Sequence, residues 1–177
     1  MFTSSAACAQ PVSYELVAKG SELRFVGEQQ GAAFTGRFKT FSAEVAFDPA
    51  APEAGRIASE VDVRSADSRS RDRDEYLQSR DFFYSRKFPT ATFETVAIEA
   101  DDDGGYRARA NLTLRGETRE VTMRFNFDPS SGARAKLTGS VLLNRLDFGV
   151  GQGEWRDTSE VADEVRVEIE LVLKVLG

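Results

Sequence analysis

Residues 106–127 read YRARANLTLRGETREVTMRFNF and carry the clearest pattern in the chain. Apolar residues alternate with polar ones from Tyr106 to Leu114, and again from Val121 to Phe127. A period of two residues indicates a β-strand with one buried face, because successive side chains of a strand point to opposite sides. Gly116 and Glu117 separate the two runs and predict a turn. These residues are therefore expected to form two antiparallel strands that share an apolar face.

The same alternation continues on both sides of this hairpin. It runs through the segments 14–19, 21–29, 34–47, 57–63, 90–100, 135–143 and 161–175. A turn is expected at Gly20–Ser21, between the first two segments, and a hairpin turn at 101–105. The pattern predicts eight or nine antiparallel strands, mostly joined by short turns.

The segment 34–47 distinguishes a barrel from a flat sheet. Its apolar residues are even-numbered up to Phe38 and odd-numbered from Phe41 onward. A strand that keeps one buried face can change parity only through a bulge or a sharp bend. Long bent strands are typical of barrels, and no helical pattern is long enough to cover a sheet. We therefore expect an all-β fold, an eight-stranded antiparallel barrel.

The segment 64–88 interrupts the strands and is expected to cross one mouth of the barrel. It begins with many charges of both signs and includes Ser70–Gln78, where we predict a short surface helix. An aromatic stretch with Phe82, Phe83 and Phe88 follows. These rings are expected either to line a ligand's entrance or to cap the barrel end. The carboxylates of Asp72, Asp74 and Asp81 fit a solvated face better than a catalytic site.

The composition excludes several classes of function. The chain has 177 residues, enough for one domain, and a net charge of −6, which argues against a nucleic-acid surface. It has no histidine, which is the commonest general base and the commonest metal ligand. It has one cysteine, so it cannot form a cluster of thiolate ligands. Neither the three aspartates at 101–103 nor the glycine-rich loop at 149–153 has the spacing of a metal or phosphate motif. We expect no catalysis and no metal.

The N-terminal segment differs from the rest. Ala7–Cys8–Ala9 has the A-x-A form of a signal-peptidase site, with cleavage before Gln10. Residues 1–12 are interpreted either as the remnant of a signal peptide or as a disordered tail, and residues 13–177 as one barrel domain. The first interpretation predicts a periplasmic protein.

The expected inner face is almost wholly apolar. Several of its residues are small for a barrel core: Ala108, Ala110, Ala135 and Gly139. If they face inward, they leave room for a long apolar ligand that makes few directional contacts. A fully packed interior is the alternative, and patterning does not separate the two.

A set of short motifs, in order, resembles the YceI family. They are Ser21-x-Leu23-x-Phe25, Gly36-x-Phe38-x-x-Phe41-x-Ala43-x-Val45-x-Phe47–Asp48–Pro49, Arg73–Asp74-x-Tyr76–Leu77-x-Ser79-x-Asp81–Phe82–Phe83, Phe88–Pro89-x-Ala91-x-Phe93, Leu112–Thr113–Leu114–Arg115–Gly116-x-Thr118–Arg119-x-Val121 and Arg145-x-Asp147–Phe148–Gly149–Val150–Gly151. They cover about residues 14–175. Family members often carry histidine where this chain has Tyr76 and Arg115, so no role of those histidines applies here.

The resemblance implies a periplasmic, lipocalin-like barrel that binds a polyisoprenoid without catalysis. The runs 27–31 and 151–155 are similar to a subgroup associated with b-type membrane cytochromes, which adds a ubiquinone-like lipid to polyprenyl phosphate or pyrophosphate as candidate ligands. The alternative function is a packed barrel that docks on such a cytochrome, and a homodimer is a further expectation. Arg80, Arg86 and Lys87 are candidates to attract an anionic head group.

The expected ligand-binding residues are the large apolar side chains of the lumen and mouth: Phe25, Phe34, Phe38, Phe41, Phe47, Phe82, Phe83, Phe88, Phe93, Leu112, Met123, Phe125, Leu137, Val141, Phe148, Trp155 and Ile169.

Overall fold

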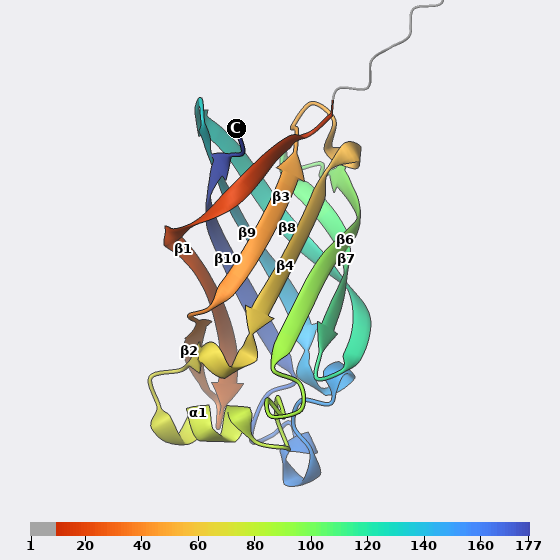
Figure 1. Cartoon of the computed structure of the whole chain (residues 1–177). Helices are drawn as coiled ribbons and strands as arrows, with labels where there is room; N and C mark the ends of the chain where they lie inside the picture. The colour runs from red at the N-terminus through yellow and green to blue at the C-terminus, as the bar shows by residue number, and fades with distance from the viewer. Residues whose placement is uncertain (1–9) are drawn as a thin grey trace, which may run out of the picture.

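The protein folds as a closed antiparallel β-barrel of eight strands, with two further short strands at one end (Figure 1). The computed structural model describes residues 10–177, apart from the side chains of residues 130 and 131. The prediction of an all-β, eight-stranded antiparallel barrel is confirmed. The strands are β1 (Val12–Gln29), β2 (Ala32–Phe38), β3 (Phe41–Phe47), β4 (Arg56–Asp62), β5 (Ala66–Asp67), β6 (Thr90–Ala100), β7 (Tyr106–Leu114), β8 (Glu117–Ser131), β9 (Arg134–Asn144) and β10 (Glu164–Val175).

The barrel closes between its first and last strands. The hydrogen-bonded order is β10-β9-β8-β7-β6-β4-β3-β1-β2-β5, and β1 also pairs with β10. The contact runs from Tyr14 opposite Val175 to Val26 opposite Arg166. Each strand of the barrel wall is thereby paired on both sides, which removes the exposed edges of an open sheet.

Strand β1 corrects one prediction from the sequence. Gly20 and Ser21 do not form a turn between two strands, because β1 continues through them and only its register with β10 shifts between Val17 and Glu22. Gly20 takes a left-handed backbone conformation with φ +90°. The Ser21 hydroxyl donates to the Val17 carbonyl at 2.7 Å and accepts from the Val172 amide at 2.8 Å. The side chain thus replaces ladder hydrogen bonds that the bulge interrupts.

The bend predicted between residues 38 and 41 is confirmed. Residues 39 and 40 form a bend that divides the segment into β2 and β3, and both strands pair with β1. β2 lies along the C-terminal half of β1 and β3 along its N-terminal half. The change of parity in the sequence therefore marks the bend at which the chain leaves the C-terminal half of β1 and begins to pair with its N-terminal half.

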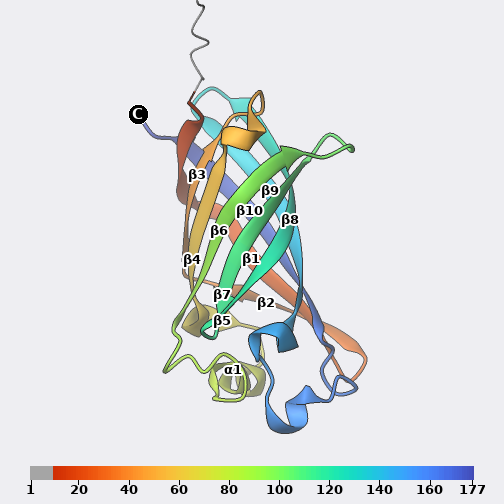
Figure 2. The ribbon, with the colours of Figure 1, turned by 90° about the vertical axis from the view of Figure 1, so that its right-hand side faces the viewer.

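The short helix predicted in the crossover is also present. α1 (Arg71–Gln78) begins after Ser70, whose side chain accepts from the Arg73 amide, and it buries Leu77. Figure 2 shows α1 and the loops of residues 145–163 at one end of the barrel, which we call the mouth. The opposite end, where the C-terminus lies, is called the closed end. No helix within residues 10–177 is long and apolar enough to cross a membrane.

Two hydrophobic clusters line the interior, one toward each end. The closed-end cluster contains a group of aromatic rings: Tyr14, Phe47, Tyr106, Phe125 and Phe127. Their ring centroids lie between 4.8 and 5.5 Å apart, mostly in edge-to-face geometry. The mouth cluster is built on residues such as Phe25, Leu77, Phe82, Phe83 and Phe148. Edge-to-face contacts at these distances are favourable for aromatic pairs.

The small residues of the inner face do not create the room expected of them. Ala108 and Ala135 are buried in the closed-end cluster, and Ala110 is fully buried as well. A Cβ atom on Gly139 would lie 2.9 Å from Cβ of Phe125. Small side chains here compensate for large neighbours, as close packing requires.

Candidate functional site: an apolar cavity at the mouth

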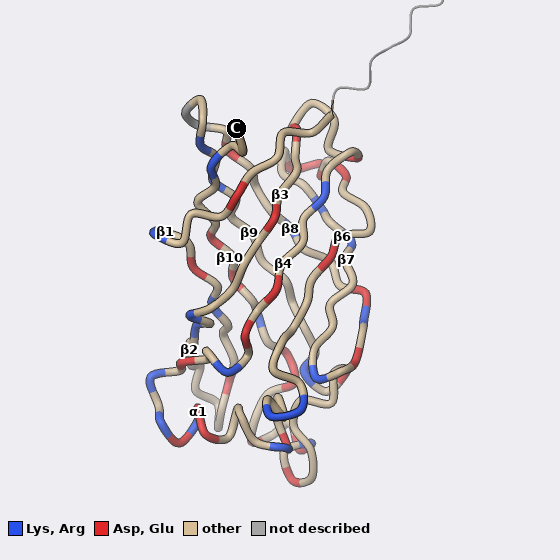
Figure 3. The backbone as a smooth tube through the Cα atoms, in the orientation of Figure 1, with Lys and Arg blue, Asp and Glu red and all other residues tan. Residues whose placement is uncertain are grey.

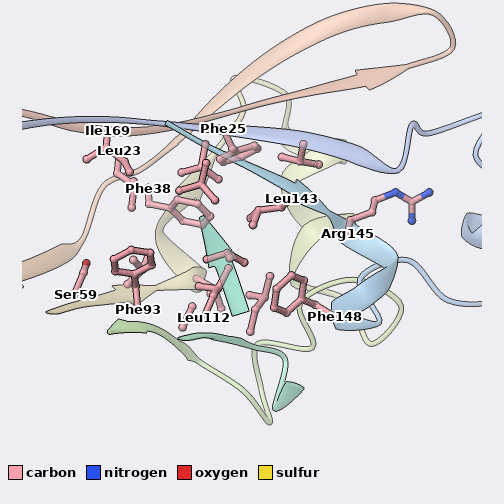
Figure 4. Close-up of a pocket in the computed structure, with 18 of the residues that line it drawn as sticks. Leu23, Phe25, Phe38, Ser59, Phe93, Leu112, Leu143, Arg145, Phe148 and Ile169 are labelled. Atoms are coloured by element: carbon pink, nitrogen blue, oxygen red, sulfur yellow. The ribbon is translucent and has the colours of Figure 1, made fainter. Parts of the chain in front are cut away.

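The mouth half of the barrel contains a cavity of about 200 Å³ (Figure 4). Nearly all the residues that line it are apolar, and the exceptions are Ser59 and Arg145. The Ser59 hydroxyl donates to the Ser42 carbonyl at 2.7 Å, so this group is already satisfied within the barrel wall. Such a cavity offers van der Waals contact and little directional bonding, which suits a hydrocarbon chain.

The cavity extends along several strands toward the mouth. On β10 the lining runs from Val165 to Leu171, a length of roughly 20 Å at 3.3 Å per residue. With strands tilted by about 40°, this corresponds to roughly 15 Å along the barrel axis. The closed-end aromatic cluster lies beyond it and shuts off the other end of the lumen.

Most of the predicted site residues line this cavity. They are Phe25, Phe34, Phe38, Phe41, Phe82, Phe83, Phe93, Leu112, Met123, Leu137, Val141, Phe148 and Ile169. The structure therefore brings these side chains together around one space. Their part in ligand binding stays a prediction.

Four predicted residues lie outside the cavity. Phe47 and Phe125 belong to the closed-end cluster, and their ring centroids lie 5.5 Å apart. They lie at the points where β3 and β8 reach the closed end of the barrel. Phe88 packs over Gly116, where a Cβ atom would lie 2.7 Å from its ring. Trp155 packs on Phe82 at 5.5 Å and on Tyr76 at 5.3 Å, on the outer side of the mouth.

Several lining residues were absent from the predicted set, among them Leu23, Val63, Leu77, Leu143, Val165 and Leu171. The two-residue period already placed Leu23 with Phe25 and Leu171 with Ile169 on the inner face. The missing information was the height of each residue in the barrel, which depends on the register between strands.

The aromatic segment 79–88 closes part of the mouth. Phe82 and Phe83 are buried and point into the mouth cluster. The Asp81 carbonyl accepts from the Gly151 amide at 2.7 Å and from the Gln152 amide at 2.9 Å. These bonds join the segment to the glycine-rich loop after β9. The expectation that this stretch passes one barrel mouth agrees with its place in the structure.

Arg145 holds the glycine-rich loop together from inside. Its side chain is 4% exposed, and its guanidinium donates to four carbonyls, those of Ala162, Val150, Trp155 and Val161, at 2.7–2.9 Å. Burial lowers the pKa of this guanidinium, and the nearby Asp163 acts in the opposite direction. A positive charge bound by carbonyl dipoles stabilises the loop conformation. Gly151 is required beside it, because a Cβ atom there would collide with Nη1 of Arg145.

Arg115 stands on the other side of the same loop. It occupies the turn between β7 and β8 in a left-handed backbone conformation, φ +53°, followed by Gly116 at φ +75°. Its Nη2 donates to the Arg80 carbonyl at 2.8 Å, while its Nε is buried without a hydrogen-bond partner among the described residues. A buried donor without a partner is uncommon in native proteins.

The acidic residues considered as catalytic candidates do not face the cavity. Asp74 accepts from the amide and the hydroxyl of Ser68, at 2.8 and 2.6 Å, and so fixes the start of α1. Asp72 and Asp81 are exposed. Within residues 10–177, no group of three His, Cys, Asp or Glu side chains is placed to hold a metal ion.

Comparisons with known proteins agree with this architecture. The profile of the YceI-like domain matches residues 14–173. A UPF0312 protein of Pseudomonas aeruginosa is 32% identical over 183 residues, covering 100% of this chain and 91% of the relative. A UPF0312 protein of Vibrio cholerae is 32% identical over 150 residues, covering 80% of this chain and 79% of the relative.

Solved structures share the barrel. The crystal structure of Burkholderia cenocepacia BcnA is similar with a TM-score of 0.84 and 34% identity, covering 89% of this chain and 98% of that one. A polyisoprenoid binding domain from Saccharophagus degradans has a TM-score of 0.73 at 19% identity, covering 93% and 99% of the two chains, and so shares the fold. The match of the domain profile to most of the chain, together with the relatives at 32–34% identity, shows that this protein belongs to the YceI-like family.

Proposed function

We propose that the protein binds or carries a long-chain isoprenoid lipid, with the hydrocarbon in the mouth cavity and without catalysis. The observation that carries this proposal is the cavity itself, which is apolar on nearly every side and shut at one end by the aromatic cluster. Membership of the YceI-like family and a structural neighbour described as a polyisoprenoid binding domain support it.

The size of the cavity limits how such a lipid is held. A cavity of about 200 Å³ is small for a long isoprenoid chain. A longer chain must either displace half-buried rings such as Phe34, Phe38 and Phe41 or extend through the mouth.

The alternative function, a packed barrel that docks on a membrane cytochrome, requires no cavity. The closed-end half of the barrel fits that description, but the mouth half does not. The cavity therefore favours lipid binding. The cytochrome partner, the homodimer and a ubiquinone-like ligand stay predictions, which pull-down from native membranes, sedimentation and lipid analysis would test.

The periplasm is the proposed location. Support comes from the A-x-A pattern at Ala7–Cys8–Ala9 and from the family resemblance. Residues 1–9, on which both interpretations of the N-terminal segment depend, lie outside the described residues. Fractionation of the natural host, with immunodetection in the periplasmic fraction, tests this location.

The first experiment measures the lipid content of the protein. Protein purified from a native-like host is extracted with organic solvent and the extract is analysed by mass spectrometry. A polyprenyl or quinone species is expected. Absence of any such species, combined with no binding of added polyprenols, would contradict the proposal.

A pair of variants on one strand tests whether the cavity is the binding site. Ala91 lines the cavity, whereas Ala97 lies further along β6 and is exposed. Ala91→Leu fills part of the cavity and is expected to weaken polyprenol binding about tenfold, since about 1.4 kcal/mol corresponds to the contacts of one to two methylene groups. Ala97→Leu adds the same side chain outside and is expected to leave binding unchanged. Equal affinities for both variants would place the ligand elsewhere.

A further inference from the structure

The barrel wall has a break in its hydrogen-bonded ladder between β8 and β9. The pairing of these two strands ends at Met123 opposite Val141. Both strands continue toward the mouth, where β8 stays paired with β7 and β9 stays paired with β10. Within residues 10–177, the facing edges of residues 117–122 and 142–144 therefore have no partner strand. We call this break the side opening.

Local contacts on both strands stabilise this break. At the end of β9 the chain is bound to the β10 side, because the Arg145 amide donates to the Asp163 carbonyl at 2.9 Å. The Leu146 amide also donates to the Asp163 carboxylate, at 3.0 Å. On β8, the Thr118 carbonyl accepts from the Arg119 guanidinium at 2.9 Å. A side chain thus bonds to an acceptor that a neighbouring strand would use in a continuous ladder.

At the side opening, one layer of side chains separates the cavity from the outside. Val121, Leu143 and Phe148 line the cavity, and the same three residues line a groove on the outer wall. The short 3-10 helix η3 (Arg145–Phe148) packs against β8 at this point, and Phe148 is only 2% exposed. Figure 4 shows Leu143 and Phe148 among the residues that surround the cavity. The ring of Phe148 therefore closes the wall where the strand ladder does not.

The outer groove combines an apolar residue with balanced charges. Charged residues of both signs are spread over the barrel wall (Figure 3). Leu142 lies in the groove and is 59% exposed, more than any other large apolar residue in the described part of the chain. Around it, Arg119 and Arg124 are balanced by Glu120 and Asp147. An exposed apolar side chain beside a cavity offers a hydrocarbon a contact outside the barrel.

The mouth itself is closed by more interactions than the side opening. The segment 79–88 covers it, and Phe82 and Phe83 are buried there. The Asp81 carbonyl accepts two amide hydrogen bonds from the glycine-rich loop, so moving this segment requires breaking them. Phe148 closes the side opening with a phenyl ring, which forms no such bonds. A rotation of this ring would open a path through the wall without breaking any pairing between β8 and β9.

We propose that the side opening is the route by which the hydrocarbon of the ligand enters and leaves the cavity, with Phe148 as its gate. This inference rests on the proposed function and adds an access route to it. The ligand passes laterally between β8 and β9 rather than along the barrel axis. A gate of this kind controls the rate of exchange, because it must move each time a ligand passes.

A reversible bridge across the side opening tests the route. Thr122 and Leu142 are exposed and follow the last pair of the β8–β9 ladder. The variant Thr122→Cys/Leu142→Cys, made together with Cys8→Ser, is joined by a bifunctional methanethiosulfonate reagent and released with dithiothreitol. Stopped-flow fluorescence follows the exchange of a fluorescent farnesol analogue on the full chain. The bridge is expected to slow association and dissociation about tenfold, and its release is expected to restore both rates.

The matched control bridges the same two strands where their ladder is continuous. Asn126 and Thr138 lie opposite each other in that part of the wall. The variant Asn126→Cys/Thr138→Cys, in the same Cys8→Ser chain and with the same reagent, is expected to leave both rates unchanged. Equal slowing by the two bridges would contradict the side route, because the effect would then not depend on the opening.

Substitution of the gate gives a second, independent measurement. Phe148→Ala is expected to raise both the association and the dissociation rate about tenfold. Phe93→Ala removes another ring that lines the cavity, away from the side opening, and is expected to raise the dissociation rate alone through lost contacts. An unchanged association rate in folded Phe148→Ala would contradict its role as a gate. If this variant does not fold, as circular dichroism would show, the bridged variants still decide the route.

The outcomes distinguish the access route from the proposed function. If the farnesol analogue binds and the bridge between positions 122 and 142 leaves its rates unchanged, the side route is contradicted while lipid binding stands. If neither the analogue nor a longer polyprenol binds to the unmodified protein, the proposed function fails and the access route fails with it.

Discussion

The two halves of the barrel interior share the same strands and are filled in opposite ways. At the closed end, Phe47 is fully buried and its ring contacts Tyr106, Phe125 and Phe127 at centroid distances of 4.8–5.5 Å. At the mouth, rings such as Phe38 are only half-buried and face a cavity of about 200 Å³. Close packing at the closed end stabilises the barrel. The mouth can therefore keep unfilled space, because the stability of the barrel does not require every layer to be packed.

The backbone shows the same division. The turns at the closed end use glycine where a left-handed conformation is needed, at Gly104 and Gly132. The non-glycine residues with positive φ among the described residues all belong to turns and loops at the mouth: Gln30, Arg69, Tyr84 and Arg115. Among the described residues, non-glycine residues in strained backbone conformations therefore occur at the mouth end of the barrel.

The largest difference between the halves is expected from removing one ring in each. Phe47→Ala is expected to lower the free energy of unfolding by about 3–5 kcal/mol, because it leaves a void in a packed cluster. Phe38→Ala is expected to cost roughly half as much, since its ring already borders open space. Urea unfolding followed by circular dichroism measures both. Equal losses would mean that the mouth half is as tightly packed in solution as the closed end.

Glycine substitutions compare the loops of the two ends. Gly151→Ala is expected to lower the free energy of unfolding by about 3 kcal/mol. The new Cβ atom displaces the buried Arg145 guanidinium from its carbonyls, and the alanine must adopt the left-handed φ of +101°. Gly132→Ala at the closed end has φ +54° and no atom within 4 Å of the new Cβ, so about 1 kcal/mol is expected. Thermal unfolding of the two variants side by side measures the difference. A Gly151→Ala variant as stable as Gly132→Ala would show that the loop adjusts freely.

Enlarging one alanine in each half gives a smaller contrast. Ala108→Leu overpacks the closed-end cluster and is expected to cost about 1–3 kcal/mol. Ala91→Leu extends into the cavity and is expected to change stability by less than about 1 kcal/mol, while it weakens lipid binding. The prediction for Ala91 is contradicted if the variant is destabilised as strongly as Ala108→Leu.

The smallest expected effect is the loss of stability at acidic pH through Asp67. The ammonium of Lys39 lies 2.8 Å from the Asp67 carboxylate and, with the Arg69 amide, lowers the pKa of that carboxyl. A folded-state pKa below the unfolded value means that the contribution to stability is present above the unfolded pKa of about 3.9. It is lost as the pH falls through the folded pKa. Asp67→Asn is therefore expected to be slightly less stable than the natural protein at pH 7 and equally stable in strong acid, as chemical unfolding at both pH values would show.

The strand pattern of the sequence predicted the fold class because each barrel strand has one apolar face. It also predicted α1 and the bend between β2 and β3. The turn at Gly20–Ser21 was wrong, since a glycine in a left-handed conformation fits a bulge as well as a turn, and only the Ser21 hydroxyl bonds to both sides distinguish them.

The cavity was predicted less well than the barrel wall. Alternation identifies inward residues such as Phe25 and Phe125 equally, but it does not say that one borders the cavity and the other the closed-end cluster. That distinction depends on the stagger of neighbouring strands, which forms only when the barrel closes. The role of Arg145 was missed for a related reason, because its four carbonyl partners come from a loop without a periodic pattern.

The pairing of β1 with β10 has a consequence for how the chain folds. These strands are separated by most of the sequence, from Tyr14 to Val175, and their contact completes the barrel. Contacts of such long sequence separation slow folding, because the entropy of closing a large loop must be overcome first. One edge of β1 therefore remains unpaired until β10 has formed and docked, while β2 and β3 pair with its other edge. During that interval the hydrogen-bonding groups along this edge are exposed and can pair with other chains.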